Sequence, residues 1–326
     1  MRGRRLSRPG AVGSWAPHAV GSAVMIEPHP RPDPLSGRLT VGFKTTPIGV
    51  EWSTLDEIWH AAGELEVFSA GWMADHLSNA NLERGGQSWE AWTLMAALAH
   101  HVPGKWLGHA VLANTFRHPA VLAKGATVMD QVTGGRFIVG LGAGWHLGEH
   151  DAFGSDLPPI GERIDRLESA VAVLRALFSE AARGEPGVTL DDRFYPLRGA
   201  VNDPPPASTA GPPIWLGGQK RRGIALAARA GNGWLLPGNR AGDVGYLVDR
   251  RDAMLRALES AGRDPAGFTI AGQVTCGETT ADRREALETA RSMVEVGAQH
   301  VILGFRPALG PDMPRAIATE VAEPLR

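Results

Sequence analysis

From residue 39 onward, short apolar runs alternate with longer amphipathic stretches. Runs such as LTVGFK, VFSAGWM, WLGHAVLA and RFIVGLG are apolar almost throughout, which is typical of strands buried on both faces of a parallel sheet. The stretches between them repeat apolar residues every three or four positions. The clearest is residues 160–178, where Ile164, Leu167 and Val171 share one face and charged residues occupy the other. Each such stretch predicts a helix that follows its strand.

The same alternation resumes after residue 212, with the apolar runs PIWLGG, GWLLPG, FTIAGQVT and HVILGF, each followed by a helical pattern. About eight strand–helix units in roughly 290 residues favour a (β/α)8 TIM barrel, an α/β fold whose usual size is ~250 residues plus insertions. A doubly wound open sheet is the alternative. A doubly wound sheet that binds a dinucleotide typically has a Gly-x-Gly-x-x-Gly turn after an early strand, and this sequence has no such turn there.

Two segments lie outside this rhythm. Residues 1–37 are rich in Arg, Pro, Gly and His without a sustained period, and we expect a disordered leader in which Met25 could serve as the start as well as Met1. Residues 38–326 then form a single barrel domain. Within it the proline-rich residues 179–212 predict an insertion over the surface, after the fourth strand–helix unit.

Composition narrows the class of protein. The 326 residues are 43% hydrophobic and 21% charged, which is ordinary for a globular protein. The formal charge of −2 offers no electrostatic case for nucleic acid or an anionic membrane surface, and no apolar run approaches the ~20 residues of a membrane span. The lone Cys276 has no partner for an internal disulfide, so we expect a cytoplasmic protein that acts on a small-molecule substrate.

In a TIM barrel the catalytic residues follow the strands, at the carboxyl-terminal mouth. Asp75 and His76 follow the second apolar run, and an imidazole near neutrality is a natural proton donor or acceptor, so we expect this pair to be catalytic. The GGQKRR stretch at 217–222 follows a later run. Its two glycines before a helix start predict backbone N–H groups open to a phosphate.

The stretch GRFIVGLGAGWHLGEHDAFG at 135–154 has three interpretations. HLGEH matches the H-x-x-E-H spacing of a zinc site, which would make His146 and His150 ligands in a zinc hydrolase. Gly148 inside the motif argues against the helix that such a site requires, and we predict no metal. The glycines at 140, 142 and 144 are also typical of a turn that cradles a phosphate. The third interpretation is the end of a barrel strand that opens into a ligand pocket, where glycines allow a ring or phosphate to approach the backbone; a tight turn with nothing bound would explain the same glycines.

The run TFRHPAVLAK…TGGRFIVGLGAGW resembles the luciferase-like family of flavin- and deazaflavin-dependent oxidoreductases. WMADHLS, GERIDRLESAVAVLRALF, RFYPLRGA and PPIWLGGQKRRGIALAARAGNGW occur in the family's order, so the resemblance covers residues 38–305. It implies the same barrel, a cytoplasmic enzyme and a homodimer. It also implies that GLGAGW lies against an isoalloxazine or deazaflavin ring, which weakens the zinc interpretation.

The resemblance assigns further roles by position. In the deazaflavin branch a bulge after the third strand supports the ring, often through a non-prolyl cis peptide, which falls here near Ala110–Val111. The family's acid and histidine fall on Asp75 and His76. The residues that the resemblance places on the cofactor are Ala110, Val111, Asn114, Gly142, Gly144, Trp145, Gly217, Gly218, Gln219, Gly238 and Asn239.

These observations predict hydride transfer between coenzyme F420 and an organic substrate. An FMN-dependent monooxygenase of the same family is the alternative, and a non-catalytic barrel that binds a phosphorylated ligand is a third hypothesis. The family's sugar-phosphate dehydrogenases carry a glutamate where this chain has Trp145. We therefore expect a substrate more apolar than a sugar phosphate.

Overall fold

The computed structural model describes residues 26, 31–79 and 86–326. Within these residues, eight parallel strands close into a barrel, because β1 pairs with both β2 and β11 and β3 pairs with β5. The predicted (β/α)8 fold is therefore confirmed. The barrel strands are β1 (Thr40–Thr45), β2 (Ala70–Met73), β3 (Trp106–His109), β5 (Phe137–Gly142), β8 (Ile214–Leu216), β9 (Gly233–Leu235), β10 (Thr269–Thr275) and β11 (His300–Gly304).

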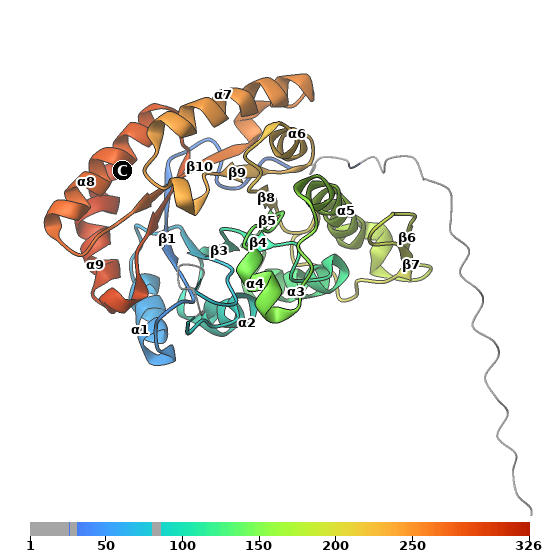
Figure 1. Ribbon diagram of the computed structural model, residues 1–326, viewed down its shortest axis with the longest axis horizontal. Helices are drawn as coiled ribbons and strands as arrows, with labels where there is room; N and C mark the ends of the chain where they lie inside the picture. The colour runs from blue at the N-terminus through green and yellow to red at the C-terminus, as the bar shows by residue number, and fades with distance from the viewer. Residues whose placement is uncertain (1–25, 27–30, 80–85) are drawn as a thin grey trace, which may run out of the picture.

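Helices surround the barrel (Figure 1). The strongest predicted helix is confirmed with the same bounds, because α5 spans Ile160–Phe178. No helix in the described ranges is long and apolar enough to cross a membrane. The others are α1 (Trp52–Gly63), α2 (Ala91–Leu98) with the 3-10 turn η1 (Ala99–His101), α3 (Pro119–Val132), α4 (Leu147–Phe153), α6 (Arg221–Ala230), α7 (Val244–Ser260), α8 (Thr280–Glu295), α9 (Met313–Ile317) and α10 (Glu323–Leu325).

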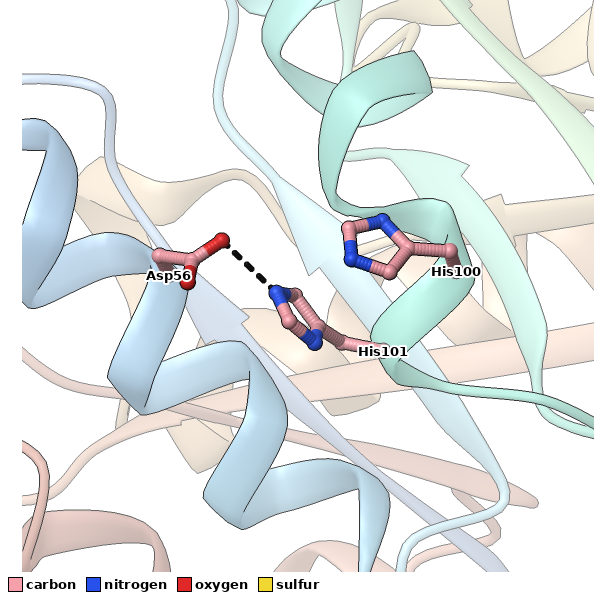
Figure 2. A group of neighbouring side chains, drawn as sticks. All are labelled: Asp56, His100 and His101. Carbon is pink, nitrogen blue, oxygen red and sulfur yellow. Dashed lines mark hydrogen bonds and ion pairs between the residues drawn. The ribbon is translucent and has the colours of Figure 1, made fainter.

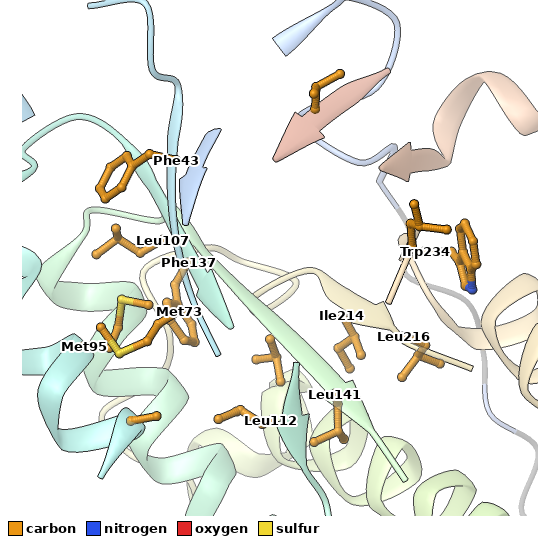
Figure 3. Packing of buried hydrophobic residues seen from close by; sticks show 14 of the residues in the cluster. Phe43, Met73, Met95, Leu107, Leu112, Phe137, Leu141, Ile214, Leu216 and Trp234 are labelled. Atoms are coloured by element: carbon orange, nitrogen blue, oxygen red, sulfur yellow. The ribbon is translucent and has the colours of Figure 1, made fainter. Parts of the chain in front are cut away.

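Successive residues along each strand point to opposite sides of the sheet, so they pack into two cores, one between the sheet and the helices and one inside the barrel. Outward-facing side chains such as Phe43, Leu107 and Phe137 pack under the helices, where Met95 of α2 meets them (Figure 3). Inward-facing side chains fill the barrel itself. There Trp72 lies against Trp215, with ring centroids 5.0 Å apart. The lower barrel is thus a packed core, which leaves the carboxyl-terminal mouth as the place for chemistry.

The barrel begins earlier in the chain than the sequence pattern indicates. Leu35 is fully buried in the inner core, and the Asp33 carboxylate accepts hydrogen bonds from the Trp215 indole and the Thr269 hydroxyl, each at 2.6 Å. Burial raises the pKa of Asp33 to about 6. Residues 31–37 therefore belong to the barrel, whereas the rest of the expected leader lies outside the described residues except for Ile26, which is buried.

The insertion at 179–212 has regular structure of its own. After the short turn η2 (Glu180–Arg183), β6 (Val188–Leu190) and β7 (Leu197–Ala200) pair as an antiparallel hairpin beside α5 (Figure 1). The insertion predicted over these residues thus contains a hairpin that the sequence pattern does not indicate. Strands of three and four residues are too short to show a period-two pattern, and pairing with each other is what forms them.

Candidate active site

The third strand ends in a bulge at the mouth. β3 stops at His109, the Ala110–Val111 peptide bond is cis, and a two-residue strand β4 (Leu112–Ala113) then pairs with the end of β5. The cis bond lies where the family resemblance predicts it. The single strand expected over WLGHAVLA is therefore two strands, with the cis peptide between them.

The glycines at the strand ends make room for this bulge. A Cβ atom on Gly142 would lie 2.7 Å from Cγ2 of Val111, and one on Gly217 would lie 3.2 Å from the same atom. Gly144, with φ +77°, faces Thr115, whose hydroxyl would lie 2.3 Å from a Cβ. The space left by these glycines is thus taken up by Val111 and Thr115, and a ligand at the mouth would meet those side chains as well as backbone.

Asp75 anchors the bulge and does not orient His76. Its buried carboxylate accepts from Arg117 Nη1 at 2.7 Å and Nη2 at 2.9 Å, and from the Ala113 backbone N–H at 2.8 Å. Arg117 also contacts Glu90 at the start of α2. Adjacent side chains leave a strand end in different directions, so Asp75 bonds the scaffold and is not paired with His76.

His76 pairs instead with Glu149 of α4. Its Nδ1 lies 3.0 Å from Oε2 and 3.2 Å from Oε1 of that carboxylate, and Oε1 also accepts from the Leu77 and Ser78 backbone N–H groups at 3.0 Å. The Glu149 side chain is only 2% exposed, against 19% for His76. Since a carboxylate that accepts two N–H groups is an acceptor, Nδ1 donates to it, and Nε2 is the atom left to exchange a proton.

The H-x-x-E-H motif forms a short helix but not a zinc site. His146 caps α4, accepting from the Glu149 N–H at 3.0 Å through Nδ1. His150 uses both ring nitrogens, Nδ1 with the His146 carbonyl at 2.7 Å and Nε2 with the Thr115 hydroxyl at 2.7 Å. Both ring nitrogens of His150 are therefore engaged in hydrogen bonds within the fold, an arrangement that does not favour the zinc hydrolase interpretation. In the sequence, Glu149 stands out only as the centre of this motif.

Trp145 stands at the entrance of the site. Its side chain is 66% exposed, and its ring meets the His76 ring edge-on with centroids 6.1 Å apart. The wall beside His76 is therefore flat and apolar.

Lys44 brings a positive charge to the end of β1. Its place at a strand end does not by itself mark it as a functional residue in the sequence. Its Nζ donates to Gln273 Oε1 at 2.5 Å, and burial lowers the pKa of this ammonium to about 8. A Cβ on Gly238 would lie 3.4 Å from the same Nζ. Lys44 thus brings a positive charge to the Gly238–Asn239 loop, which is itself exposed.

The Gly217–Gln219 loop lies directly against α6. A Cβ on Gly218 would lie 2.5 Å from the Cα of Gly223, so only glycine allows this approach. The side-chain amide of Gln219 turns back and donates to the Gly217 carbonyl at 2.7 Å. The same nitrogen lies 3.4 Å from the Leu235 carbonyl oxygen, so both of its N–H groups are directed at the backbone and not at the mouth. The backbone of the loop remains at the start of the helix.

One buried polar atom at the bulge fits a cofactor ring. Asn114 is 3% exposed, and its Oδ1 has no hydrogen-bond partner among the described residues. A buried acceptor without a partner is costly, and the imide N–H of a flavin or deazaflavin ring would satisfy it. The residues present at this end of the barrel are therefore compatible with such a ring.

Curated relatives match parts of the chain. A phthiodiolone/phenolphthiodiolone dimycocerosates ketoreductase of Mycobacterium sp. (strain JLS) is 32% identical over 209 residues, 61% of this chain and 51% of that protein. An F420-dependent glucose-6-phosphate dehydrogenase of Kribbella flavida is 32% identical over 196 residues, 56% of this chain and 57% of that protein. The chain thus spans little more than half the length of these relatives.

Solved structures show the same fold. An F420-dependent secondary alcohol dehydrogenase in complex with an F420-acetone adduct superposes with a TM-score of 0.75 at 19% identity, covering 89% of this chain and 99% of that one. The model of the luciferase-like monooxygenase family matches residues 49–318, which is most of the barrel. The chain therefore belongs to the luciferase-like monooxygenase family.

Proposed function

We propose that this protein transfers a hydride between coenzyme F420 and an alcohol or carbonyl carbon of an organic substrate. The observation that carries the proposal is the His76–Glu149 pair at the barrel mouth, in which Glu149 holds Nδ1 and Nε2 has no hydrogen bond to any residue that the structure describes. A ketoreductase and an F420-dependent dehydrogenase among the relatives support this assignment.

The residues of this chain supply the proton chemistry and the binding. When bound, the deazaflavin accepts or gives the hydride. In the oxidising direction the alcohol O–H proton passes to Nε2 of His76, while Nδ1 stays hydrogen-bonded to Glu149; in reduction the same Nε2 returns it. The buried carboxylate stabilises the imidazolium, which forms in oxidation and loses its proton in reduction. Asp75 is a positioning residue, because it holds the bulge through Ala113 and Arg117.

Cofactor contacts divide between two parts of the mouth. We place the ring on the bulge, where Asn114 offers an unpartnered oxygen, and the phosphate at the two glycine loops, where Lys44 adds charge. Trp145 faces the substrate, so an apolar alcohol or ketone fits better than a sugar phosphate. The ring contacts proposed are Ala110, Val111, Asn114, Gly142 and Gly144, and the phosphate contacts are Gly217, Gly218, Gly238 and Asn239.

Fluorescence titration of the protein with F420 and, separately, with FMN tests the cofactor. Tight binding of F420 alone supports the proposal, and an Asn114→Ala variant should then bind it more weakly, since the buried acceptor is lost. Binding of FMN alone would refute it in favour of a flavin-dependent monooxygenase, the activity that the family's description favours. Binding of neither would refute both.

We further propose a homodimer that forms through α3. Val121, Val128 and Val132 are 69%, 59% and 60% exposed, and their spacing of seven and four residues places them on one face. An exposed apolar stripe of this kind is typical of an interface between subunits. Light scattering should show a dimer for the wild type and a monomer for the Val128→Lys variant.

The buried Cys276 thiol fits the cytoplasmic location proposed from the sequence.

A further inference from the structure

A second group of ligand-type side chains lies on the outer layer of the barrel. Asp56 projects from α1, and His100 and His101 project from η1 toward it (Figure 2). One candidate ligand atom of each residue lies within 4.8 Å of those of the other two. His101 Nε2 and Asp56 Oδ1 are 2.7 Å apart, and the two imidazole rings have centroids 3.9 Å apart.

This cluster is separate from the mouth. η1 ends at His101, a few residues before β3 enters the barrel at Trp106, so it lies at the amino-terminal end of the strands. The His76–Glu149 pair lies at the opposite, carboxyl-terminal end. The cluster is therefore not an extension of the proposed active site.

His100 is held in the form that a metal requires. Its Nδ1 lies 2.7 Å from the Ala97 carbonyl oxygen, and because a carbonyl only accepts, Nδ1 carries the hydrogen. In the neutral ring, Nε2 then has a free lone pair. A backbone carbonyl on the second ring nitrogen is the arrangement that orients metal-binding histidines. A simple Asp56–His101 pair would not need this second imidazole beside it.

We infer that Asp56, His100 and His101 bind a divalent transition-metal ion such as Zn²⁺. Two imidazole nitrogens and one carboxylate oxygen, with water in the fourth position, match the ligands and coordination number that this ion prefers. Around a tetrahedral Zn²⁺ the ligand atoms lie ~3.3 Å apart, given metal–ligand bonds of ~2.0–2.1 Å.

The present separations of the ligand atoms lie on both sides of that value. The His101–Asp56 distance of 2.7 Å opens slightly, and the longer separations, which are at most 4.8 Å, close. His101 is neutral when its hydrogen moves from Nε2 to Nδ1, so coordination proceeds without net proton release and without any redox step. Asp56 and His100 are partly or fully exposed, which leaves them free to move.

The bound ion would join α1 to the end of α2. α1 already packs against η1, since a Cβ on Gly63 would lie 1.9 Å from the His101 carbonyl oxygen, and a metal bridge would add a second link between them. Because the unfolded chain does not bring the three ligands together, the ion stabilises the folded state. At a free metal concentration of about 100 times Kd, the ratio of folded to unfolded protein rises about 100-fold.

The test uses the full-length, tag-free protein and Zn²⁺ or Co²⁺ alone. We expect one ion per chain by equilibrium dialysis, a higher Tm with Zn²⁺, and the visible absorption of tetrahedral Co²⁺. The His100→Gln/His101→Gln double variant should fold and lose all three. His146→Asn, which keeps a capping side chain on α4 but removes an imidazole from the mouth, should retain them.

Three results would overturn the inference. The first is the absence of stoichiometric binding by the wild-type chain. The second is undiminished binding by the double variant. The third is loss of binding in His146→Asn, which would place the ion at the mouth. None of these outcomes bears on the cofactor titration, so the two proposals fail independently.

Discussion

Replacing Glu149 with Gln isolates the role of one buried carboxylate. In the wild type, Oε1 accepts from the Leu77 and Ser78 N–H groups and Oε2 faces Nδ1 of His76 at 3.0 Å. Gln occupies the same space, and its amide oxygen must stay on the two backbone donors because an NH₂ group cannot accept. The amide nitrogen then faces Nδ1, which forces the His76 hydrogen onto Nε2.

The expected effect is a large loss of turnover with little change in binding. The neutral tautomer can no longer accept the substrate proton at Nε2, and the imidazolium loses its buried counter-charge. General acid–base catalysis contributes about 10²–10⁴-fold, so kcat should fall by that factor, equivalent to about 3–5 kcal/mol in activation free energy. Affinity for the cofactor should not change, because Glu149 does not lie among the proposed ring contacts.

The assay is the rate of F420 oxidation or reduction, measured at saturating substrate over a range of pH. Glu288→Gln, an exposed substitution of the same type on α8, serves as the control. His76→Gln should lose as much as Glu149→Gln, and the double variant should lose no more than either, because the two side chains act as a unit. If Glu149→Gln keeps the wild-type kcat and pH profile, the proton does not travel through this pair.

Three further substitutions test the scaffold around the site. Asp75→Ala leaves Arg117 without its buried partner and should lower the free energy of unfolding by about 3–5 kcal/mol, measured with urea. Gly142→Ala places a methyl group 2.7 Å from Val111 and should cost about 1–3 kcal/mol of stability and weaken F420 binding, measured by fluorescence. Asp33 has its pKa raised from 3.8 to about 6, so the folded protein retains a proton that the unfolded chain releases between these values. The wild type should therefore lose about 2 kcal/mol of stability relative to Asp33→Asn as the pH rises from 4 to 6, measured by denaturation at each pH.

Each of these three substitutions has a matched control and an outcome that would contradict the prediction. Asp165→Ala removes an exposed ion pair and should change stability by less than about 1 kcal/mol, so an equal effect at Asp75 would contradict the buried pair. Gly184, where a Cβ meets nothing within 4 Å, is the control for Gly142, and equal F420 affinity in both alanine variants would contradict the packing argument. A stability difference for Asp33→Asn that stays level from pH 4 to 6 would show that its pKa is not raised.

The alternation of apolar runs and amphipathic stretches was enough to predict the barrel. Periods of two and 3.6 are local properties, and burial of both strand faces is visible in each run separately. α5 is confirmed at 160–178 for this reason. The catalytic mouth followed from the same pattern, because strand ends can be located without knowing what faces them. The prediction of a cis bond at Ala110–Val111 came from the family resemblance, because the residues around it have no local sequence pattern that indicates a cis peptide.

Only the tertiary structure decided which side chains pair with each other. His76 meets Glu149 from 73 positions away, and Asp33 meets Trp215 from 182 positions away. Closing the barrel brings these side chains together, and nothing in the local sequence around either residue indicates its partner. The same limit explains HLGEH, whose spacing matches zinc while its histidines cap a helix and hold Thr115. A side chain's identity sets the bonds it can make, but the fold alone sets which groups lie within reach.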